Sequence, residues 1–360
     1  MTAILAQPLA YALVVCGAVA LALPLNYLLI RLCRRYDILD HPTNRKRHTR
    51  PTPNIGGAAL LVCVVVTILC AKVIFAGSFV GHDAPWLSLS VGAALVFAVG
   101  LIDDVRPVGA WVKLLAQVAA GLILFSGGVS LQMISVPFVG EIAPGGWGAL
   151  ITIFWVALLS NAINLIDGLD GLAGGVSLIA TSSLAAIFYL LQVEQGTLIC
   201  CALGGALIGF LFFNLHPAKL FLGDSGSLLI GYMFAALSLL APVKSFTGAA
   251  LFVPLVALAI PLIEVTSSFT RRLLAGKHIF AGDRRHLFHY LGYLGLSPQA
   301  TVRVFWAGGA LFGALSVSML FWDRALTVTV LVTVMVAVLG AILILGLRLR
   351  RTGAQSLRRR

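Results

Sequence analysis

Charged residues are scarce in this sequence. Only 11% of its 360 residues are charged, 60% are hydrophobic, and the mean hydropathy is +1.02. A soluble domain carries about 25% charged residues, so the composition disfavours a soluble protein and also one with a single membrane anchor. It predicts an all-α polytopic membrane protein, because helices satisfy their own backbone hydrogen bonds inside lipid.

Cysteine and early positive charge are also lacking. The six cysteines form no CxxC pair, and most of them fall in apolar runs, which indicates neither a disulfide framework nor a zinc site. No Lys or Arg precedes Arg31, so the basic start of a cleavable signal peptide is missing. The first apolar run is therefore expected to remain as a helix.

Long apolar runs dominate what is present. Runs of about 17 to 23 residues can cross the hydrocarbon core as helices, and about eleven such spans are predicted. They lie at residues 10–31, 55–76, 86–102, 110–127, 147–164, 172–192, 196–213, 225–241, 247–268, 302–321 and 325–347.

Basic residues give these spans an orientation. Every Lys and Arg except Lys72, Lys244 and Arg324 falls in alternate loops or in the tail 348–360. Basic loops stay in the cytoplasm, which predicts an external N-terminus and a cytoplasmic C-terminus for a single membrane domain over residues 1–360. The net charge of +12 therefore reports topology and does not indicate nucleic-acid binding.

Acidic residues gather on the same predicted face. Those at or near its loops are Asp103, Asp104, Asp167, Asp170, Asp224, Glu264 and Asp283. A transport pathway would distribute acids through the depth of the membrane. The asymmetry favours an active site on the cytoplasmic face, with an ion-coupled transporter as the weaker alternative.

The loop from Leu39 to Gly57 is basic and rich in proline. Arg45, Lys46 and His48 form its centre. Contact with anionic lipid headgroups is one interpretation of this loop, and binding of an anionic substrate is the other. The residues alone leave both open.

Two adjacent carboxylates follow the predicted span 86–102. Asp103 and Asp104 would cost several kcal/mol to desolvate unless they were paired or bound to a metal. A helix cap explains one of them and hardly both. Lys113 begins the following helix, where its ammonium group could face a phosphate.

The stretch NAINLIDGLDGLAGG lies between two apolar runs. Asn161, Asn164, Asp167 and Asp170 follow one another at intervals of three residues, so neighbours share one face of a helix. The interleaved glycines would end the helix there and let the backbone approach a ligand closely.

Two later motifs add a metal-binding and a phosphate-binding character. In FLGDSGSLLIGY, Asp224 stands at the start of a predicted helix, either as a helix cap or as a metal ligand. Further along, His286 and His289 follow Arg284 and Arg285, a combination that suits binding of a diphosphate. Hard oxygen ligands without soft ones indicate Mg²⁺ or Mn²⁺. Such an ion with surrounding Lys, Arg and His is typical of phosphoryl transfer.

In this order, over about residues 37 to 300, these motifs resemble those of the polyprenyl-phosphate N-acetylhexosamine-1-phosphate transferases. The resemblance implies transfer of a sugar phosphate from a UDP-N-acetylhexosamine to polyprenyl phosphate, with release of UMP, at the bacterial cytoplasmic membrane. It implies magnesium ligands at Asp224 and Asn164. The residue pattern and the resemblance together predict catalytic residues at Asp103, Asp104, Asp167 and Asp170, and substrate-binding residues at Arg45, Lys46, His48, Lys113, Asn161, Arg284, Arg285, His286 and His289.

Departures from the family pattern bear on the sugar. Pro107 stands where the lipid I-forming branch has a lysine, Phe288 replaces the middle histidine of an HxHH motif, and Glu264 stands where Asp is frequent. They favour a plain UDP-N-acetylhexosamine as the donor, and UDP-N-acetylglucosamine is the sugar we expect, for an envelope glycan such as O-antigen. Lipid I synthesis from UDP-MurNAc-pentapeptide is the alternative, and a homodimer is left open.

Overall fold

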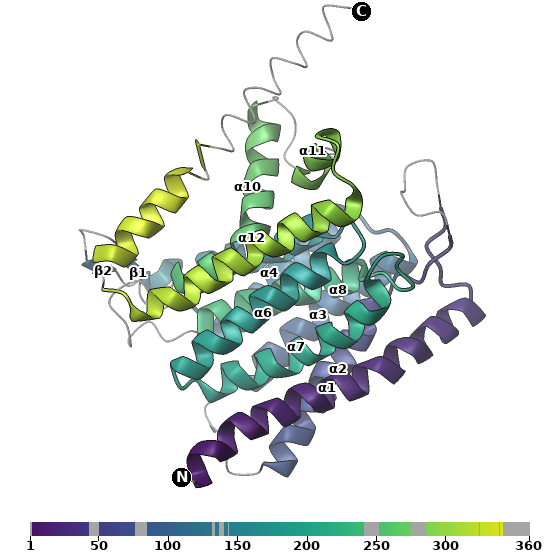
Figure 1. Ribbon diagram of the computed structural model, residues 1–360, viewed down its shortest axis with the longest axis horizontal. Coiled ribbons are helices and arrows are strands. Elements are labelled where there is room, and N and C mark those ends of the chain that lie inside the picture. The colour runs from purple at the N-terminus through teal and green to yellow at the C-terminus, as the bar shows by residue number, and fades with distance from the viewer. Residues whose placement is uncertain are drawn as a thin grey trace, which may run out of the picture.

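The chain folds into a bundle of long helices (Figure 1). The computed structural model describes residues 2–42, 50–75, 85–131, 134–136, 140–142, 144–240, 252–274, 286–323, 325–337 and 339–340. The helices of the first half are α1 (Thr2–Arg35), α2 (Gly56–Ile74), α3 (Trp86–Val105), α4 (Ala110–Ser126), η1 (Gly145–Trp147), α5 (Gly148–Ile166) and α6 (Leu172–Leu190). Those of the second half are α7 (Glu194–Asn214), α8 (Gly223–Leu240), α9 (Phe252–Ala257), α10 (Ala259–Leu274), α11 (Leu287–Tyr293), α12 (Pro298–Ser318) and η2 (Met319–Phe321).

Within the described ranges, eight helices are long and apolar enough to cross a membrane. They coincide with eight of the predicted spans and confirm a multi-pass membrane protein. The predicted span 110–127 is the shorter α4, and a helix at Ala325–Ala337 begins the predicted span 325–347. A short antiparallel hairpin of β1 (Ile134–Val136) and β2 (Gly140–Ile142) was not predicted.

One span differs from the prediction. Where a single helix was expected over 247–268, the described residues form α9 and α10 with a break at Leu258. Pro261 has no backbone N–H to donate to the carbonyl of Ala257, and its ring crowds that carbonyl. The proline therefore explains the break, and α10 leaves the bundle steeply (Figure 1).

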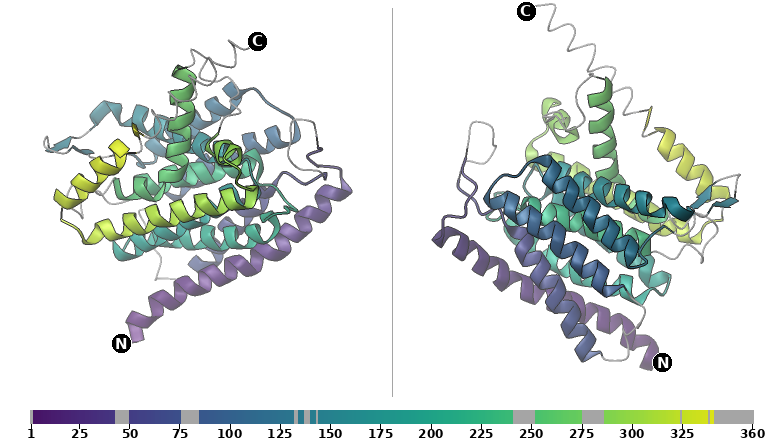
Figure 2. Two further views of the ribbon diagram at one scale, coloured as in Figure 1. Left: turned by 45° about the horizontal axis from the view of Figure 1, so that its top comes forward. Right: turned by 180° about the vertical axis from the view of Figure 1, so that it is seen from behind.

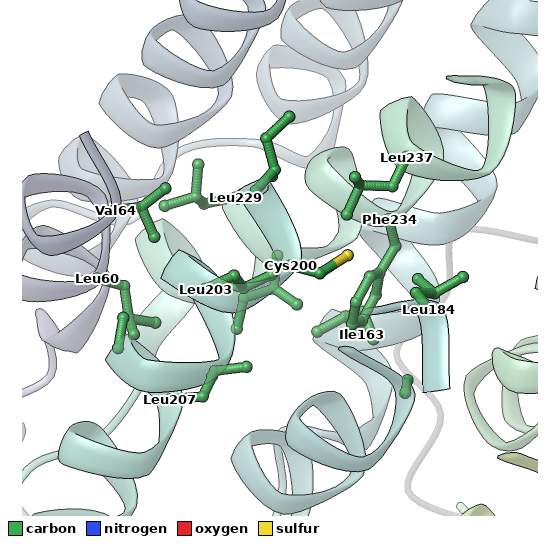
Figure 3. Close-up of a cluster of buried hydrophobic side chains, with 14 of the residues drawn as sticks. Leu60, Val64, Ile163, Leu184, Cys200, Leu203, Leu207, Leu229, Phe234 and Leu237 are labelled. Atoms are coloured by element: carbon green, nitrogen blue, oxygen red, sulfur yellow. The ribbon is translucent and has the colours of Figure 1, made fainter. Parts of the chain in front are cut away.

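The centre of the bundle is made by α7 and α8. Helices α1 and α6 pack on different sides of α7, and helices α3 and α5 pack against α8. A Cβ at Gly205 or Gly209 would collide with Ala18 or Ala22 of α1, so these glycines allow the two backbones to approach closely. Side chains from α2, α5, α6, α7 and α8 meet in the core between these helices (Figure 3).

The connections bring four helix ends together. The end of α3, the start of α4, the end of α5 and the start of α8 meet at one end of the bundle, as the hydrogen bonds between their polar side chains show. Figure 2 shows α3 and α4 covering the rear of the bundle. This common end holds the acidic motifs of the sequence.

Candidate active site

Asp104 caps the start of α8. Its carboxylate accepts hydrogen bonds from the backbone N–H groups of Asp224 (2.7 Å) and Ser225 (3.0 Å), and from the side-chain amide of Asn54 (3.3 Å). The first N–H groups of a helix have no partner within the helix, and Asp104 supplies one from α3. Gly223 allows this approach, because a Cβ there would collide with Asp104 and its φ is +74°.

Asp103 faces a different partner. Its Oδ1 accepts from the backbone N–H of Val108 (2.8 Å), and its Oδ2 lies 3.2 Å from Lys113 Nζ. The same ammonium nitrogen lies 2.6 Å from Asp224 Oδ2. Lys113 of α4 thus bridges the carboxylates of α3 and α8 and offsets their mutual repulsion.

Asn164 completes this group from α5. Its side-chain nitrogen donates to Asp224 Oδ1 (2.9 Å) and to the Ser227 hydroxyl (2.9 Å). We call Asp103, Asp104, Lys113, Asn164 and Asp224 the carboxylate cluster. In the described ranges no group of three or more His, Cys, Asp or Glu residues is arranged to hold a metal ion. Mg²⁺ commonly takes only one or two carboxylates and completes its shell with water and substrate phosphates, so Asp224 with Asn164 fits it.

The amide pair Asn161 and Gln117 extends the polar surface along α5 and α4. Asn161 Nδ2 lies 2.9 Å from the Gln117 side-chain oxygen and 2.7 Å from the carbonyl oxygen of Ala157. Gln117 is buried one helical turn beyond Lys113, and Asn161 is exposed one turn before Asn164. Asn161 therefore lies one helical turn from Asn164, a member of the carboxylate cluster.

The turn between α5 and α6 separates its two acids. Asp170 Oδ2 lies 2.8 Å from His216 Nδ1 and accepts from the backbone N–H of Ala218 (3.1 Å). No described residue donates a hydrogen bond to Asp167, which stands at the end of α5. Burial, followed by repulsion from Asp224, Asp104 and Asp170, raises the pKa of Asp167 to about 8.

Neighbouring elements hold this turn in place. Gly171 has a φ of +76°, donates its N–H to the Asn214 side chain (3.0 Å), and accepts at its carbonyl from the indole of Trp306 (3.2 Å). Asn214 in turn donates to the carbonyl oxygen of Leu220 (2.9 Å). The end of α7 and the side chain of Trp306, within α12, therefore fix the backbone of the turn.

A cavity of about 440 Å³ opens beside the turn. Its lining includes Asp170, Leu169, His216, Pro217 and Phe221. The walls combine apolar side chains with a few polar ones: the Asp170 carboxylate, the His216 imidazole, and the side chains of Arg50, Thr52 and Gln299. This composition is typical of a pocket for a small organic ligand.

The histidine motif lies against the same turn. Phe288 is buried, and a Cβ at Gly168 would collide with its ring. His286 stacks on Phe288 with ring centroids 5.4 Å apart, and the His289 ring lies 4.4 Å from the Phe288 ring. The structure therefore brings His286 and His289 close to the NAINLIDGLDGLAGG stretch, 120 residues earlier in the chain.

Five predicted substrate-binding residues lie outside the described residues. They are Arg45, Lys46, His48, Arg284 and Arg285.

Several polar residues of the site were not predicted. They are Asn54, Asn214, His216 and Ser227, which contact the predicted acids or the turn that carries them. Their only signal in the sequence is position, because each lies in or beside a loop on the predicted cytoplasmic face. Their partners are 43 to 63 residues away along the chain, which spacing cannot reveal.

Comparison with known proteins gives a consistent family. A sequence model of glycosyl transferase family 4 matches residues 86–241, which run from α3 to the end of α8. The chain is 35% identical over 287 residues to a probable undecaprenyl-phosphate N-acetylglucosaminyl 1-phosphate transferase of Bacillus subtilis, covering 78% of this chain and 77% of that protein.

Two other relatives are similar over most of their length. A decaprenyl-phosphate N-acetylglucosaminephosphotransferase of Mycobacterium tuberculosis (strain H37Rv) is 31% identical over 341 residues, which is 88% of this chain and 82% of that relative. A phospho-N-acetylmuramoyl-pentapeptide-transferase of Staphylococcus saprophyticus is 32% identical over 280 residues, which is 73% of this chain and 83% of that relative.

Proposed function

The chain belongs to glycosyl transferase family 4, and on that premise we propose that it transfers N-acetylglucosamine 1-phosphate from UDP-N-acetylglucosamine to a polyprenyl phosphate. A phosphate oxygen of the lipid attacks the phosphorus next to the sugar. The bond from that phosphorus to the oxygen shared with the uridylyl phosphate breaks, and UMP leaves with that oxygen. The product is polyprenyl-diphospho-N-acetylglucosamine.

The convergence of Asp103, Lys113, Asn164 and Asp224 carries this proposal. These residues come from four helices, and their polar atoms lie 2.6 to 3.2 Å apart. Phosphoryl transfer depends mainly on alignment and on neutralising the charge of the transferring group. The ammonium group of Lys113 is held where it can offset that charge, and Asp103 orients it.

In this proposal, Asp224 and Asn164 bind Mg²⁺, for which Mn²⁺ would be a substitute. A half-turn of the Asn164 amide would present its oxygen beside the Asp224 carboxylate. When bound, the ion would offset negative charge on the diphosphate and orient it.

The two adjacent acids have different tasks. Asp104 is occupied by two backbone N–H groups of α8, so it positions Asp224 and does not act on the substrate. Polyprenyl phosphate has a second pKa of about 6 and is largely a dianion at neutral pH. The attacking oxygen therefore needs no general base, and Asp103 acts through Lys113.

The uridine is assigned to the 440 Å³ cavity beside the turn. Leu169 and Phe221 offer apolar surface for a planar base, and Asp170 is fixed by His216 and Ala218 at its edge. This location places the diphosphate between the cavity and the carboxylate cluster, next to Asp167.

The proposal includes the topology that the basic loops predict. Eleven spans, an external N-terminus and a cytoplasmic C-terminus place the carboxylate cluster on the cytoplasmic side of a bacterial inner membrane, where UDP-sugars are made. The whole chain then acts as one membrane domain that begins an envelope glycan. A reporter that is active only in the cytoplasm, fused after Arg360, tests this orientation. We expect activity, and an inactive reporter would place the C-terminus outside.

UMP release by the purified protein tests the reaction. We expect release from UDP-N-acetylglucosamine and undecaprenyl phosphate, its loss with EDTA, and a fall of at least about 1000-fold in Asp224→Asn. Asp323→Asn is the matched control, because Asp323 lies at the opposite end of α12 and caps another helix. Release only from UDP-MurNAc-pentapeptide would assign the chain to lipid I synthesis, and no release from any UDP-sugar would refute the transferase.

A further inference from the structure

A carboxylate outside the carboxylate cluster joins α10 to the histidine motif. Glu264 is fully buried, and its two oxygens have different partners. Oε1 lies 3.0 Å from His286 Nδ1 and 3.9 Å from the guanidinium nitrogen Nη2 of Arg271, and Oε2 accepts from the backbone N–H of Leu287 at 3.0 Å. In Figure 1, α10 and α11 stand close together above α12. Since a buried carboxylate is costly without such partners, this contact is specific.

The contact decides which nitrogen of the His286 ring faces outward. The N–H of Leu287 can only donate, and a carboxylate can only accept. Nδ1 of His286 must therefore carry a hydrogen to bond Oε1, which leaves Nε2 as the atom free to meet a ligand. In the described part of the chain no residue bonds to Nε2, and 14% of the side chain is exposed.

The ring is also held from its face. Phe288 stacks on it with an interplanar angle of 12°, and Phe288 itself packs against Gly168. His286 is thus fixed by Glu264 on one side and by the turn between α5 and α6 on the other.

We propose that Glu264 is a positioning residue that fixes the tautomer of His286 and directs Nε2 toward the substrate diphosphate. The role assigned to Nε2 rests on the proposed function, whereas the tautomer does not.

Glu264→Gln is the informative change because it is almost isosteric. The amide oxygen must stay opposite the N–H of Leu287, since two donors 3.0 Å apart would repel each other. The amide nitrogen then faces His286 Nδ1 and donates to it. The ring can accept this bond only if its hydrogen moves to Nε2, so the substitution inverts the tautomer.

Nitrogen-15 NMR of the full-length protein with labelled histidine measures this directly. At pH 8, we expect the His286 signals, assigned by their loss in His286→Gln, to show a protonated Nδ1 in the wild type and a protonated Nε2 in Glu264→Gln. Glu194→Gln is the matched control, because Glu194 bonds a neutral side chain, Gln7, far from the motif. It should leave the His286 signals unchanged.

Transferase kinetics supply the second readout. Loss of a residue that orients a functional histidine typically costs about 10- to 100-fold in activity. We expect Glu264→Gln to lower kcat by that factor, with KM for the UDP-sugar changed less than about twofold, because the binding cavity is separate. Glu264→Asp keeps a carboxylate and should restore the Nδ1–H tautomer and part of kcat.

Two results would overturn the inference. One is a bare Nδ1 on His286 in the wild type, a result that needs no mutant to fold. The other is an unchanged tautomer and an unchanged kcat in Glu264→Gln. A wild type without transferase activity but with the expected tautomers would refute the proposed function while leaving the Glu264 contact established.

Discussion

The start of α8 and the turn between α5 and α6 both carry acids, but the acids of the two regions differ in their hydrogen-bond partners. At α8, Asp104 accepts two backbone N–H groups, and Asp224 shares Lys113 with Asp103. In the turn, no described residue donates to Asp167, whose pKa is raised to about 8. Each acid of the first region has a hydrogen-bond donor or a cation beside it, whereas burial without a described donor dominates at Asp167. The first region therefore holds its acids by specific contacts, whereas the second leaves Asp167 without a described donor.

Removing the Lys113 ammonium group, which two carboxylates share, should cause the largest loss of activity. In Lys113→Ala, two carboxylates lose the ammonium group between them, and the substrate diphosphate loses a countercharge. We expect kcat to fall by about 100- to 1000-fold, measured as UMP release at saturating substrate. Lys72→Ala is the control, since Lys72 stacks on Trp86 away from the cluster. Activity in Lys113→Ala near that of Lys72→Ala would contradict the assignment.

Substitutions of the adjacent acids Asp103 and Asp104 should affect activity and stability separately. Asp104→Asn replaces one acceptor by a donor opposite the backbone N–H groups of α8, so we expect a loss of about 2 kcal/mol in stability. Asp103→Asn should leave the melting temperature nearly unchanged and lower kcat, because it weakens the hold on Lys113. Thermal unfolding in detergent with parallel activity assays checks both. Equal destabilisation by the two changes would show that Asp104 has no special capping role.

Contact between the turn and the histidine motif predicts a rescue. In Gly168→Ala, the added Cβ collides with the buried Phe288 ring and displaces α11. We expect kcat to fall by about tenfold. Phe288→Leu should recover part of this loss in the double variant, because the smaller side chain relieves the collision. Strictly additive effects would mean that the two positions act independently.

The last prediction concerns the pH dependence of stability. The pKa of Asp167 is near 8 in the folded chain and near 3.8 when it is unfolded, so the folded protein binds this proton more tightly. The contribution of Asp167 to stability therefore declines as pH rises from about 4 to about 8. Melting temperatures without divalent cations should show Asp167→Asn gaining on the wild type across that range. A constant difference would show that the acid is ionised throughout.

Much of the site could be predicted from the residues, and the limits have a physical cause. The convergence of Asp224, Asn164 and Lys113 was predicted, because spans of known length return to the same face. The division of labour between Asp103 and Asp104 was not. Adjacent residues on a helix point about 100° apart, so they meet different neighbours, and spacing does not say which neighbours these are.

The sequence by itself determined most of the membrane helices, because hydrophobicity is a local property that sums along the chain. It also determined which loops hold the acids and the family motifs, because these depend only on residue order. Only the tertiary structure decided which donor each acid meets. Asp104 and the N–H of Asp224 are 120 residues apart, and the contact between Glu264 of α10 and His286, which precedes α11, was not predicted. Such contacts depend on the packing of entire helices against one another, which no short stretch of residues specifies.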